Sequence, residues 1–241
     1  MCQPRDYRHW IGNSDLVPFK VLVKQTDLHI QARRSLKDKA LKSVLKHRAS
    51  LEEYILHHPL FLTTLEPYEV EQAAPVIVKR MAEASQLACV GPMAAVAGAI
   101  AEMVGTDLLR FTPEVIVENG GDIFLRILKK RVVGIYAGQS RVTGNLALEI
   151  KPQDTPLGVC ASSASVGHSL SLGTADAVIA LSPSAPLADA LATAVGNMIG
   201  DTGDIPKTLE KAKRMPQLCG LVIVKGDTIG AWGKVRLVSL G

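Results

Sequence analysis

The residues whose types and spacing could support chemistry begin where an apolar run ends near the middle of the chain. Residues 115–118 have the pattern of a buried strand, and Asn119, Gly120, Gly121 and Asp122 follow. Asn-Gly between apolar runs is a hairpin signal because a tight turn needs positive φ, so the glycines could serve a turn alone. Alternatively, two residues without a Cβ let a ligand approach the backbone, with Asp122 as a polar group beside it. The local sequence leaves both interpretations open.

A second candidate site lies on a helix that the sequence predicts from Ser184 to about Ile199. Asp189 and Thr193 are four residues apart on it, so they share one helix face. A carboxylate and a hydroxyl suit Mg²⁺, which prefers oxygen ligands and often binds one or two protein groups together with substrate phosphates. The alternative is structural, because the helix dipole favours Asp early in a helix and Thr can bond back to a carbonyl. The surrounding face is Ala, Leu and Val, so two polar residues there need an explanation.

A third group of polar side chains follows Cys160 in a stretch rich in small residues, and it includes Ser162, Ser163 and His168. Backbone N–H groups and hydroxyls in such a loop can cradle a phosphate, and His168 could serve as an acid or base, or activate a serine. A serine-rich turn can also be only a turn. The chain has no G-x-S-x-G elbow, no Walker A motif, no G-x-G-x-x-G and no H-E-x-x-H.

The elements that must position these residues occur in blocks of helices and blocks of strands. This order favours an α+β fold with mainly antiparallel sheets packed with helices. We expect a single domain over residues 1–241, with 1–16 as a loose lead-in and 151–171 as loop. The expected helices are 35–57 with Ser35 as its cap, 67–88, 93–104, 184–199 and 205–213. The expected strands are a hairpin over 19–31, then 115–118, 122–128, 132–137, 146–150 and 175–181, and a C-terminal meander of 221–224, 228–231 and 235–238.

The helix expected over 93–104 is rich in small residues. Gly98 inside it costs about 1 kcal/mol relative to Ala. We therefore expect Gly98 where this helix approaches another backbone closely. Small residues here and exposed strand edges would also suit a homodimer.

Composition excludes several classes of protein. The chain has 241 residues, 47% of them hydrophobic, which excludes full disorder. The net charge is +4, with much of the excess in the first fifth of the chain, and this mild basicity is compatible with a phosphate-bearing ligand. A nucleic-acid-binding protein usually shows a denser basic face with interleaved aromatics, so none is expected as a partner.

The cysteines and the apolar segments bear on the compartment. The four cysteines are far apart and form no C-x-x-C pair, as expected of free thiols in a reducing compartment. Residues 1–10 carry charges and no apolar core, unlike a signal peptide. No run approaches about 18 strongly apolar residues, so no membrane span is expected. The predicted location is cytoplasmic.

Three stretches together resemble the ApbE-like superfamily in order and rough spacing. They are E-N-G-G-D at 118–122, V-C-A-S-S at 159–163 and A-D-A-L-A-T-A at 188–194. The best-known members are Mg²⁺-dependent FAD:protein FMN transferases, which move FMN from FAD to a Thr or Ser hydroxyl of a target protein. They carry an N-(L/I)-G-G-D stretch, a T-S-G loop and an A-D-x-x-A-T helix. The chain looks most similar to a small bacterial and archaeal branch of the superfamily.

The resemblance implies an ApbE-like fold, FAD or FMN and Mg²⁺ as cofactors, and a protein as acceptor. Asp189 and Thr193 match the metal ligands of the family. The implied flavin and pyrophosphate contacts are Asn119, Gly120, Gly121, Asp122, Ser162 and Ser163, and the implied catalytic residues are His168 and Asp122. Transfer at a pyrophosphate needs a cation to offset the charge that develops on the leaving phosphate.

The chain departs from the transferase pattern at several places. Ala97 stands where a family lysine falls, His168 and Gly173 are the echoes of an H-x-x-D-P-x-T-G segment, and residues 1–90 lack the usual flavin-contacting motif. Two hypotheses follow. The chain is an enzyme that transfers FMN or cleaves a flavin pyrophosphate, or it holds a flavin or another cofactor without chemistry.

Overall fold

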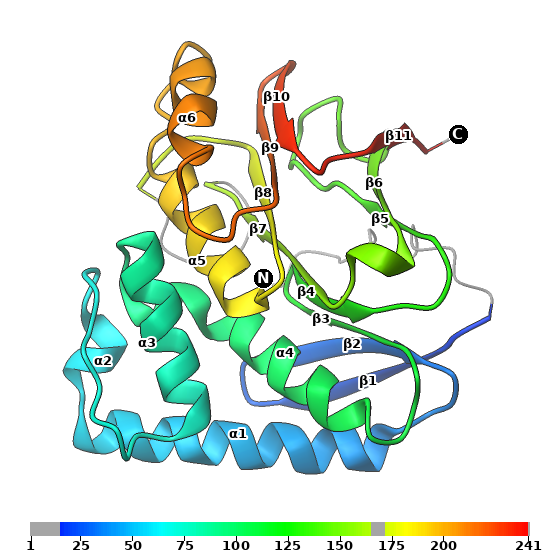
Figure 1. The fold of residues 1–241 in the computed structure, drawn as a ribbon, viewed down its shortest axis with the longest axis vertical. Helices are drawn as coiled ribbons and strands as arrows, with labels where there is room; N and C mark the ends of the chain where they lie inside the picture. Colours follow the sequence, from blue (N-terminus) through cyan, green and yellow to red (C-terminus); the bar gives the residue numbers. More distant parts are fainter. Residues whose placement is uncertain (1–14, 165–171, 241) are drawn as a thin grey trace.

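The computed structural model describes residues 15–164 and 172–240 (Figure 1). Its helices are α1 (Lys37–His57), α2 (Leu60–Thr63), α3 (Val76–Ala88), α4 (Val96–Leu108), α5 (Ala185–Gly196) and α6 (Asp204–Ala212), with 3₁₀ helices η2 (Pro92–Ala95) and η3 (Pro152–Asp154). Its strands are β1 (Val17–Val23), β2 (Thr26–Ala32), β3 (Val115–Asn119), β4 (Asp122–Arg126), β5 (Arg131–Gly134), β6 (Leu146–Ile150), β7 (Leu157–Ser162), β8 (Ala177–Ser182), β9 (Gly220–Lys225), β10 (Thr228–Gly233) and β11 (Leu237–Ser239).

The strands of the described residues form two sheets. The larger sheet has eight strands in the order β1-β2-β3-β4-β7-β8-β9-β10, and the smaller has three in the order β11-β6-β5. Every pairing is antiparallel. The predicted α+β class with antiparallel sheets is therefore confirmed.

The two faces of the large sheet bury different cores. Because successive side chains of a strand point to opposite faces, Phe124 of β4 packs with the helices, whereas Ile123 and Leu125 pack with the small sheet. Figure 1 shows α3, α4 and α5 on one side of the large sheet and β5, β6 and β11 on the other. Alternate residues of a central strand therefore belong to two compartments, one between the large sheet and the helices and the other between the two sheets.

Helices α4 and α5 cross at Gly98, as the sequence predicted. A Cβ on Gly98 would lie 2.4 Å from the Ala185 carbonyl oxygen and 3.0 Å from the Asp189 Cβ. The two helices also cap each other. Asp189 Oδ2 accepts the Gly98 N–H at 2.9 Å, and Glu102 Oε2 accepts the Ala185 N–H at 2.7 Å. These carboxylates satisfy donors that a helix leaves unpaired in its first turn.

Three expectations about the elements are wrong. The helix expected over 67–88 begins only at Val76, because Pro75 has an extended backbone (φ −55°, ψ 149°). The segment expected as loop over 151–171 contains β7, whose Gly158 leaves room for the Ala185 backbone. The C-terminal meander stops at β10, and β11 pairs with β6 in the small sheet. These segments take their structure from distant partners, which local patterns do not specify.

The proposed cap of the first long helix is also wrong. The residue at its N-cap position is Leu36, and no side chain caps the helix there. Ser184 does occupy the N-cap position of α5, but its hydroxyl makes no capping bond. Glu102 provides an acceptor for the first turn of α5 instead.

A buried ion network joins the small sheet to the large one. Glu114, fully buried just before β3, contacts Arg33 and accepts a bond at 3.2 Å from the Arg131 guanidinium of β5. Arg131 also pairs with Asp15 at 2.6 Å. The network fixes the position of β5 against the large sheet.

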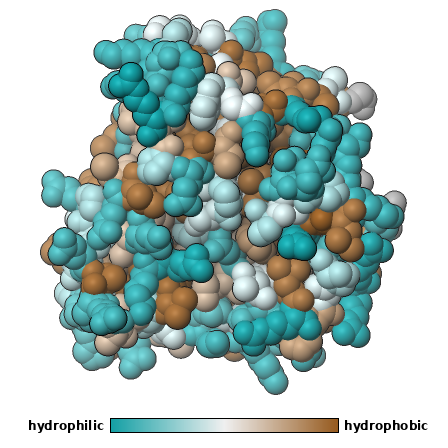
Figure 2. Space-filling view, in the orientation of Figure 1, coloured by the Kyte–Doolittle hydropathy of each residue, from teal (hydrophilic) through white to brown (hydrophobic). Residues whose placement is uncertain are grey.

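The surface facing the viewer in Figure 2 mixes hydrophilic groups with scattered smaller hydrophobic ones. Across the part of the chain that the structure describes, no single helix has the length and apolar composition needed to cross a bilayer. Together, α3 and the segment from Pro92 to Leu108 have the length and composition of a membrane span, but the two are bent by 106° at their junction.

Candidate functional site

The Gly-Gly stretch is a two-residue hairpin turn. Asn119 pairs with Asp122, and Gly120 and Gly121 between them have φ of +70° and +114°. Side chains other than glycine rarely adopt such values, so turn formation accounts for both residues. Both also line a cavity. The two interpretations of the sequence are therefore compatible with each other.

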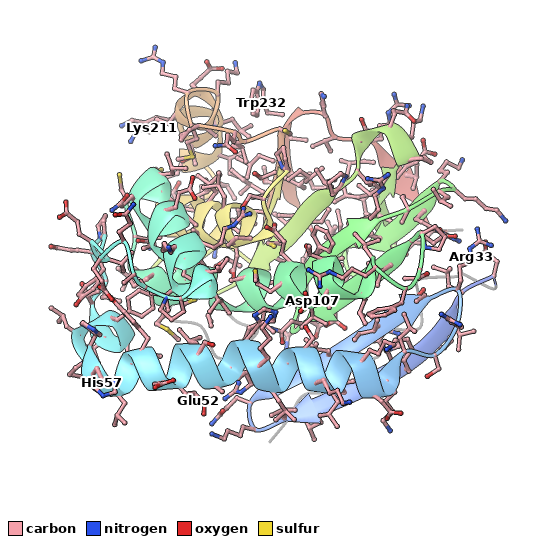
Figure 3. All side chains as sticks on the ribbon, turned by 60° about the horizontal axis from the view of Figure 1, so that its bottom comes forward. Arg33, Glu52, His57, Asp107, Lys211 and Trp232 are labelled. Carbon is pink, nitrogen blue, oxygen red and sulfur yellow. The ribbon has the colours of Figure 1, made fainter. Side chains whose placement is uncertain are left out.

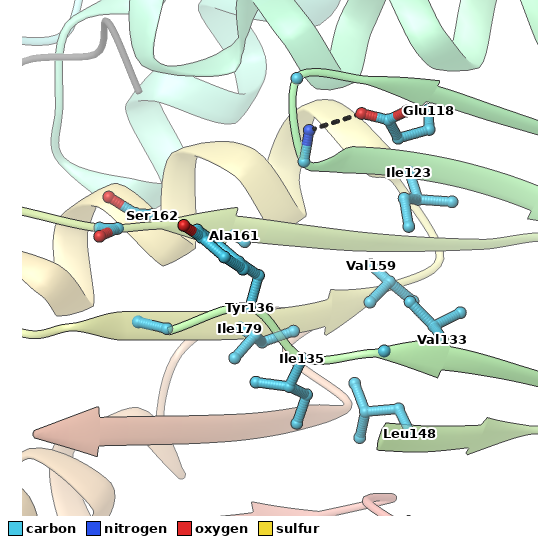
Figure 4. Close-up of a pocket in the computed structure, with 15 residues that line it drawn as sticks. Glu118, Ile123, Val133, Ile135, Tyr136, Leu148, Val159, Ala161, Ser162 and Ile179 are labelled. Atoms are coloured by element: carbon cyan, nitrogen blue, oxygen red, sulfur yellow. Dashed lines mark hydrogen bonds between the residues drawn. The ribbon is translucent and has the colours of Figure 1, made fainter. Parts of the chain in front are cut away.

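The cavity lies between the two sheets and has a volume of about 90 Å³. Figure 4 shows its walls, where apolar side chains from both sheets face one another. Ligand pockets are usually about 300–1,000 Å³, so this space could enclose only part of a ligand of ordinary size. The labelled lining residues are Glu118, Ile123, Val133, Ile135, Tyr136, Leu148, Val159, Ala161, Ser162 and Ile179.

Glu118 is the carboxylate that lines this cavity, and it was not among the site residues predicted from the sequence. It is 2% exposed, and its Oε1 accepts the Gly121 N–H at 3.1 Å (Figure 4). The alternation of side chains along a strand could have indicated its position. Glu118 lies two residues from Ile116, so both face the small sheet. A buried acceptor in an apolar wall can select a ligand that presents an N–H group.

Asp122 and Asp189 form a carboxylate pair on the helix side of the sheet. Asp122 Oδ1 accepts the Ala161 N–H at 3.2 Å, while burial, with a further contribution from the charge of Glu118, raises the pKa of Asp122 to about 7. Burial, and then the charge of Asp122, raise the pKa of Asp189 well above its usual value. The charge of Asp122 therefore opposes the ionisation of Asp189.

The other predicted residues divide between the two compartments. Gly120, Gly121, Ser162 and Ser163 line the cavity. Asn119 Nδ2 donates to the Ala97 carbonyl at 3.2 Å and so holds the start of α4. Thr193 lies one helical turn beyond Asp189 and is 8% exposed. His168 lies outside the described residues.

The donors of the carboxylate pair fit a hard cation such as Mg²⁺. Two carboxylates and a hydroxyl are sufficient protein ligands for this ion, which retains several waters. Among the described residues no group of three or more His, Cys, Asp or Glu side chains could hold a metal, so a zinc-type cluster is not found there. A cation would also favour the ionised forms of both carboxylates, which burial disfavours.

Asp189 has a structural role besides any ligand role. The N-cap residue of α4 is Ala95, and no side chain of that helix caps it. The Asp189 carboxylate lies at this positive end of α4 through its bond to Gly98. One oxygen of Asp189 is therefore committed to α4.

A comparison with protein families identifies the chain. The family described as "AbpE bacteria" matches residues 8–216. The chain belongs to this family. Relatives of this chain include the UPF0280 protein of Methanocaldococcus jannaschii, which is 42% identical over 222 residues, and that of Methanocella arvoryzae, which is 42% identical over 217 residues. The first alignment covers 90% of each chain, and the second covers 90% of this chain and 88% of the other.

Solved structures show the same fold. The flavinyl transferase ApbE of Pseudomonas stutzeri aligns with a TM-score of 0.57 and 12% identity over 91% of this chain and 95% of that chain. The ApbE protein of Thermotoga maritima aligns with a TM-score of 0.58 and 13% identity, over 89% of this chain and 96% of that chain. The resemblance to the ApbE-like superfamily is confirmed, and at these identities the likeness concerns the fold.

Proposed function

We propose that this AbpE bacteria protein binds a flavin nucleotide, with FAD as the first candidate, together with Mg²⁺, and that it transfers FMN or cleaves the flavin pyrophosphate. The observation that carries the proposal is the Asp122–Asp189 pair. Both groups have raised pKa values, and among the described residues neither forms an ion pair with a lysine or arginine. A divalent cation supplies the missing positive charge.

Each residue has a definite part in this proposal. Asp122, Asp189 and Thr193 hold Mg²⁺, which when bound offsets the charge developing on the leaving phosphate. The cavity takes the edge of the flavin ring, and Glu118 accepts an N–H from it. Ser162 and Ser163 donate hydroxyl hydrogen bonds to phosphate oxygens. Asp122 is also a candidate base for an attacking hydroxyl, as the resemblance to the family implies. His168 remains a candidate acid or base from its sequence position alone.

Ligand-dependent thermal melting tests this proposal. The protein is melted with FAD, FMN, ATP or S-adenosylmethionine, each with Mg²⁺ or with EDTA. A ligand at about 100 times its Kd stabilises the fold by about 2.7 kcal/mol. We expect a rise in Tm with FAD that requires Mg²⁺, and release of AMP on prolonged incubation. No rise with any flavin would refute the proposal.

The variant Ala161→Trp tests the role of the cavity separately from that of the carboxylate pair. Ala161 lines the cavity, its side chain is exposed, and only its backbone N–H contacts Asp122. An indole there fills the mouth, so we expect the FAD-dependent rise in Tm to disappear while a rise with Mg²⁺ alone persists. Ala161→Ser is the matched control and should keep both responses. Unchanged FAD binding in Ala161→Trp would exclude this cavity as the flavin site.

A flavin-binding protein without chemistry is the second candidate. The observation that favours it is Ala97, which stands at the position of the family lysine and whose carbonyl accepts a hydrogen bond from Asn119 Nδ2. In this case FAD binds tightly, EDTA does not weaken the complex, and no AMP appears over hours. Titration of flavin fluorescence, followed by chromatography of the nucleotides, distinguishes the two candidates.

A further inference from the structure

A separate groove lies between α1 and the C-terminal end of α4. Its volume is about 260 Å³, and Figure 3 shows Asp107 between α1 and the elements above it. Asp107 lies nine positions after Gly98 on α4, about 14 Å along the helix axis. The groove is thus distinct from the carboxylate pair. It is lined by Lys39, Lys42, Ser43, Lys46, Asp107, Leu108, Arg110 and Phe111.

Four exposed cations surround this groove. Lys39, Lys42 and Lys46 follow one side of α1 over about 10 Å, and Arg110 comes from the opposite wall. Other cations of this region are paired, as Lys24 and Arg48 are with Glu52. Within residues 15–164 and 172–240, none of the four lies within 4.0 Å of a carboxylate oxygen. Three cations from the first fifth of the sequence therefore meet Arg110 here, and Asp107 is the one carboxylate among the groove-lining residues.

One fixed acceptor lies among these cations. Asp107 Oδ2 accepts the Ser43 hydroxyl at 2.8 Å and contacts His47 Nε2 at 2.9 Å. The Asp107 side chain is 26% exposed, and no hydrogen bond to its other oxygen is found in the described residues. Lys39 Nζ lies 4.0 Å above the centre of the Phe111 ring. The groove thus offers several positive charges and a carboxylate oxygen held in place.

We propose that this groove binds an acidic segment of a partner protein. The row of cations matches several carboxylates spaced along an extended chain. The second oxygen of Asp107, Oδ1, can accept a backbone N–H. A peptide has this donor, whereas a fully ionised phosphate chain lacks it. A nucleic acid is a poorer match, because the single aromatic ring lining the groove is covered by Lys39.

This inference does not depend on flavin binding. The groove lies away from the cavity and from Asp122 and Asp189, so the partner is defined by charge and hydrogen bonding alone. Occupancy of the groove and activity of the flavin site can be measured separately on the same protein.

The test uses a short fluorescein-labelled peptide of alternating Glu and Gly, with binding followed by fluorescence anisotropy. The groove variant is Lys39→Glu, Lys42→Glu and Lys46→Glu combined. The control carries the same charge change on α6 and just after it, at Lys207, Lys211 and Arg214, which are also exposed. Figures 1 and 3 both show α6 on the opposite side of the molecule from α1. Melting curves confirm that both variants are folded.

We expect the unmodified protein to bind the peptide with an affinity that falls as salt rises. The groove variant should bind at least tenfold more weakly, and the α6 control should bind like the unmodified protein. Bound peptide should also protect Lys42 and Lys46 from acetic anhydride, as read by mass spectrometry. Absence of binding, or equal losses in both variants, would overturn the proposal. The proposal would also be overturned if inorganic polyphosphate or RNA displaced the peptide and its own binding was lost in the groove variant but kept in the α6 control.

Discussion

Replacing Asp189 with Asn is expected to stabilise the protein in EDTA and to remove its response to Mg²⁺. The amide oxygen can still accept the Gly98 N–H, so the cap on α4 persists. The substitution removes a buried carboxylate whose pKa is raised well above its usual value by burial and then by the charge of Asp122. One pKa unit corresponds to about 1.4 kcal/mol, so we expect the free energy of unfolding at pH 8 to rise by at least about 1 kcal/mol.

The effect of this substitution should depend on pH. The pKa of Asp122 rises from 3.8 to about 7 in the folded protein, and that of Asp189 is also raised. The folded protein therefore holds protons that the unfolded chain releases. Stability from these groups is fully present below about pH 4, falls as pH rises toward 7, and levels off above the folded pKa values. Asp189→Asn should flatten this decline, as measured by urea unfolding at several pH values in EDTA.

The same variant should lose catalysis if the proposed function holds. Metal assistance contributes several kcal/mol to a reaction at phosphate, so Mg²⁺-dependent AMP release should fall at least about 100-fold. Glu102→Gln is the matched control, because Glu102 is a largely buried carboxylate that caps the facing helix. It should keep the Mg²⁺-dependent rise in Tm. A normal Mg²⁺ response in Asp189→Asn would remove Asp189 from the metal site and leave it only its role on α4.

Gly98→Ala is expected to destabilise the protein strongly although alanine favours helix. The intrinsic gain is about 1 kcal/mol. The new Cβ would lie 2.4 Å from the Ala185 carbonyl oxygen, a backbone atom that can move only with α5. Separating α4 from α5 weakens both reciprocal caps, so we expect a net loss of about 3 kcal/mol, and a fall in Tm of about 6–12 °C.

Gly200→Ala provides the comparison for this substitution. Gly200 is exposed, and the nearest atom to its added Cβ is a side-chain oxygen of Asp204 at 3.3 Å. Its stability should change by less than about 0.5 kcal/mol. Equal stability of Gly98→Ala and the unmodified protein in chemical denaturation would show that the helices tolerate a wider separation than the geometry implies.

The sequence by itself determined the features that depend on neighbouring residues. The Asn119–Asp122 turn follows from two glycines between apolar runs, and its positive φ values confirm that signal. The close approach at Gly98 was predictable because a glycine inside an apolar helix requires a reason. Motif order also placed the chain in the ApbE-like superfamily, which the family comparison confirms. The roles of the predicted flavin and metal residues remain predictions.

Only the tertiary structure decided which of these features meet. Asp189 contacts an amide 91 positions earlier, and Asp122 contacts one 39 positions later, so neither partner is visible in local spacing. Strand parity indicates that Glu118 and Asn119 point to opposite faces, but the structure shows that one face holds a cavity and the other holds the start of α4. The pairing of β11 with β6 was likewise unpredictable. Periodicity specifies which side of an element is buried, whereas its partner depends on how all the buried faces pack together.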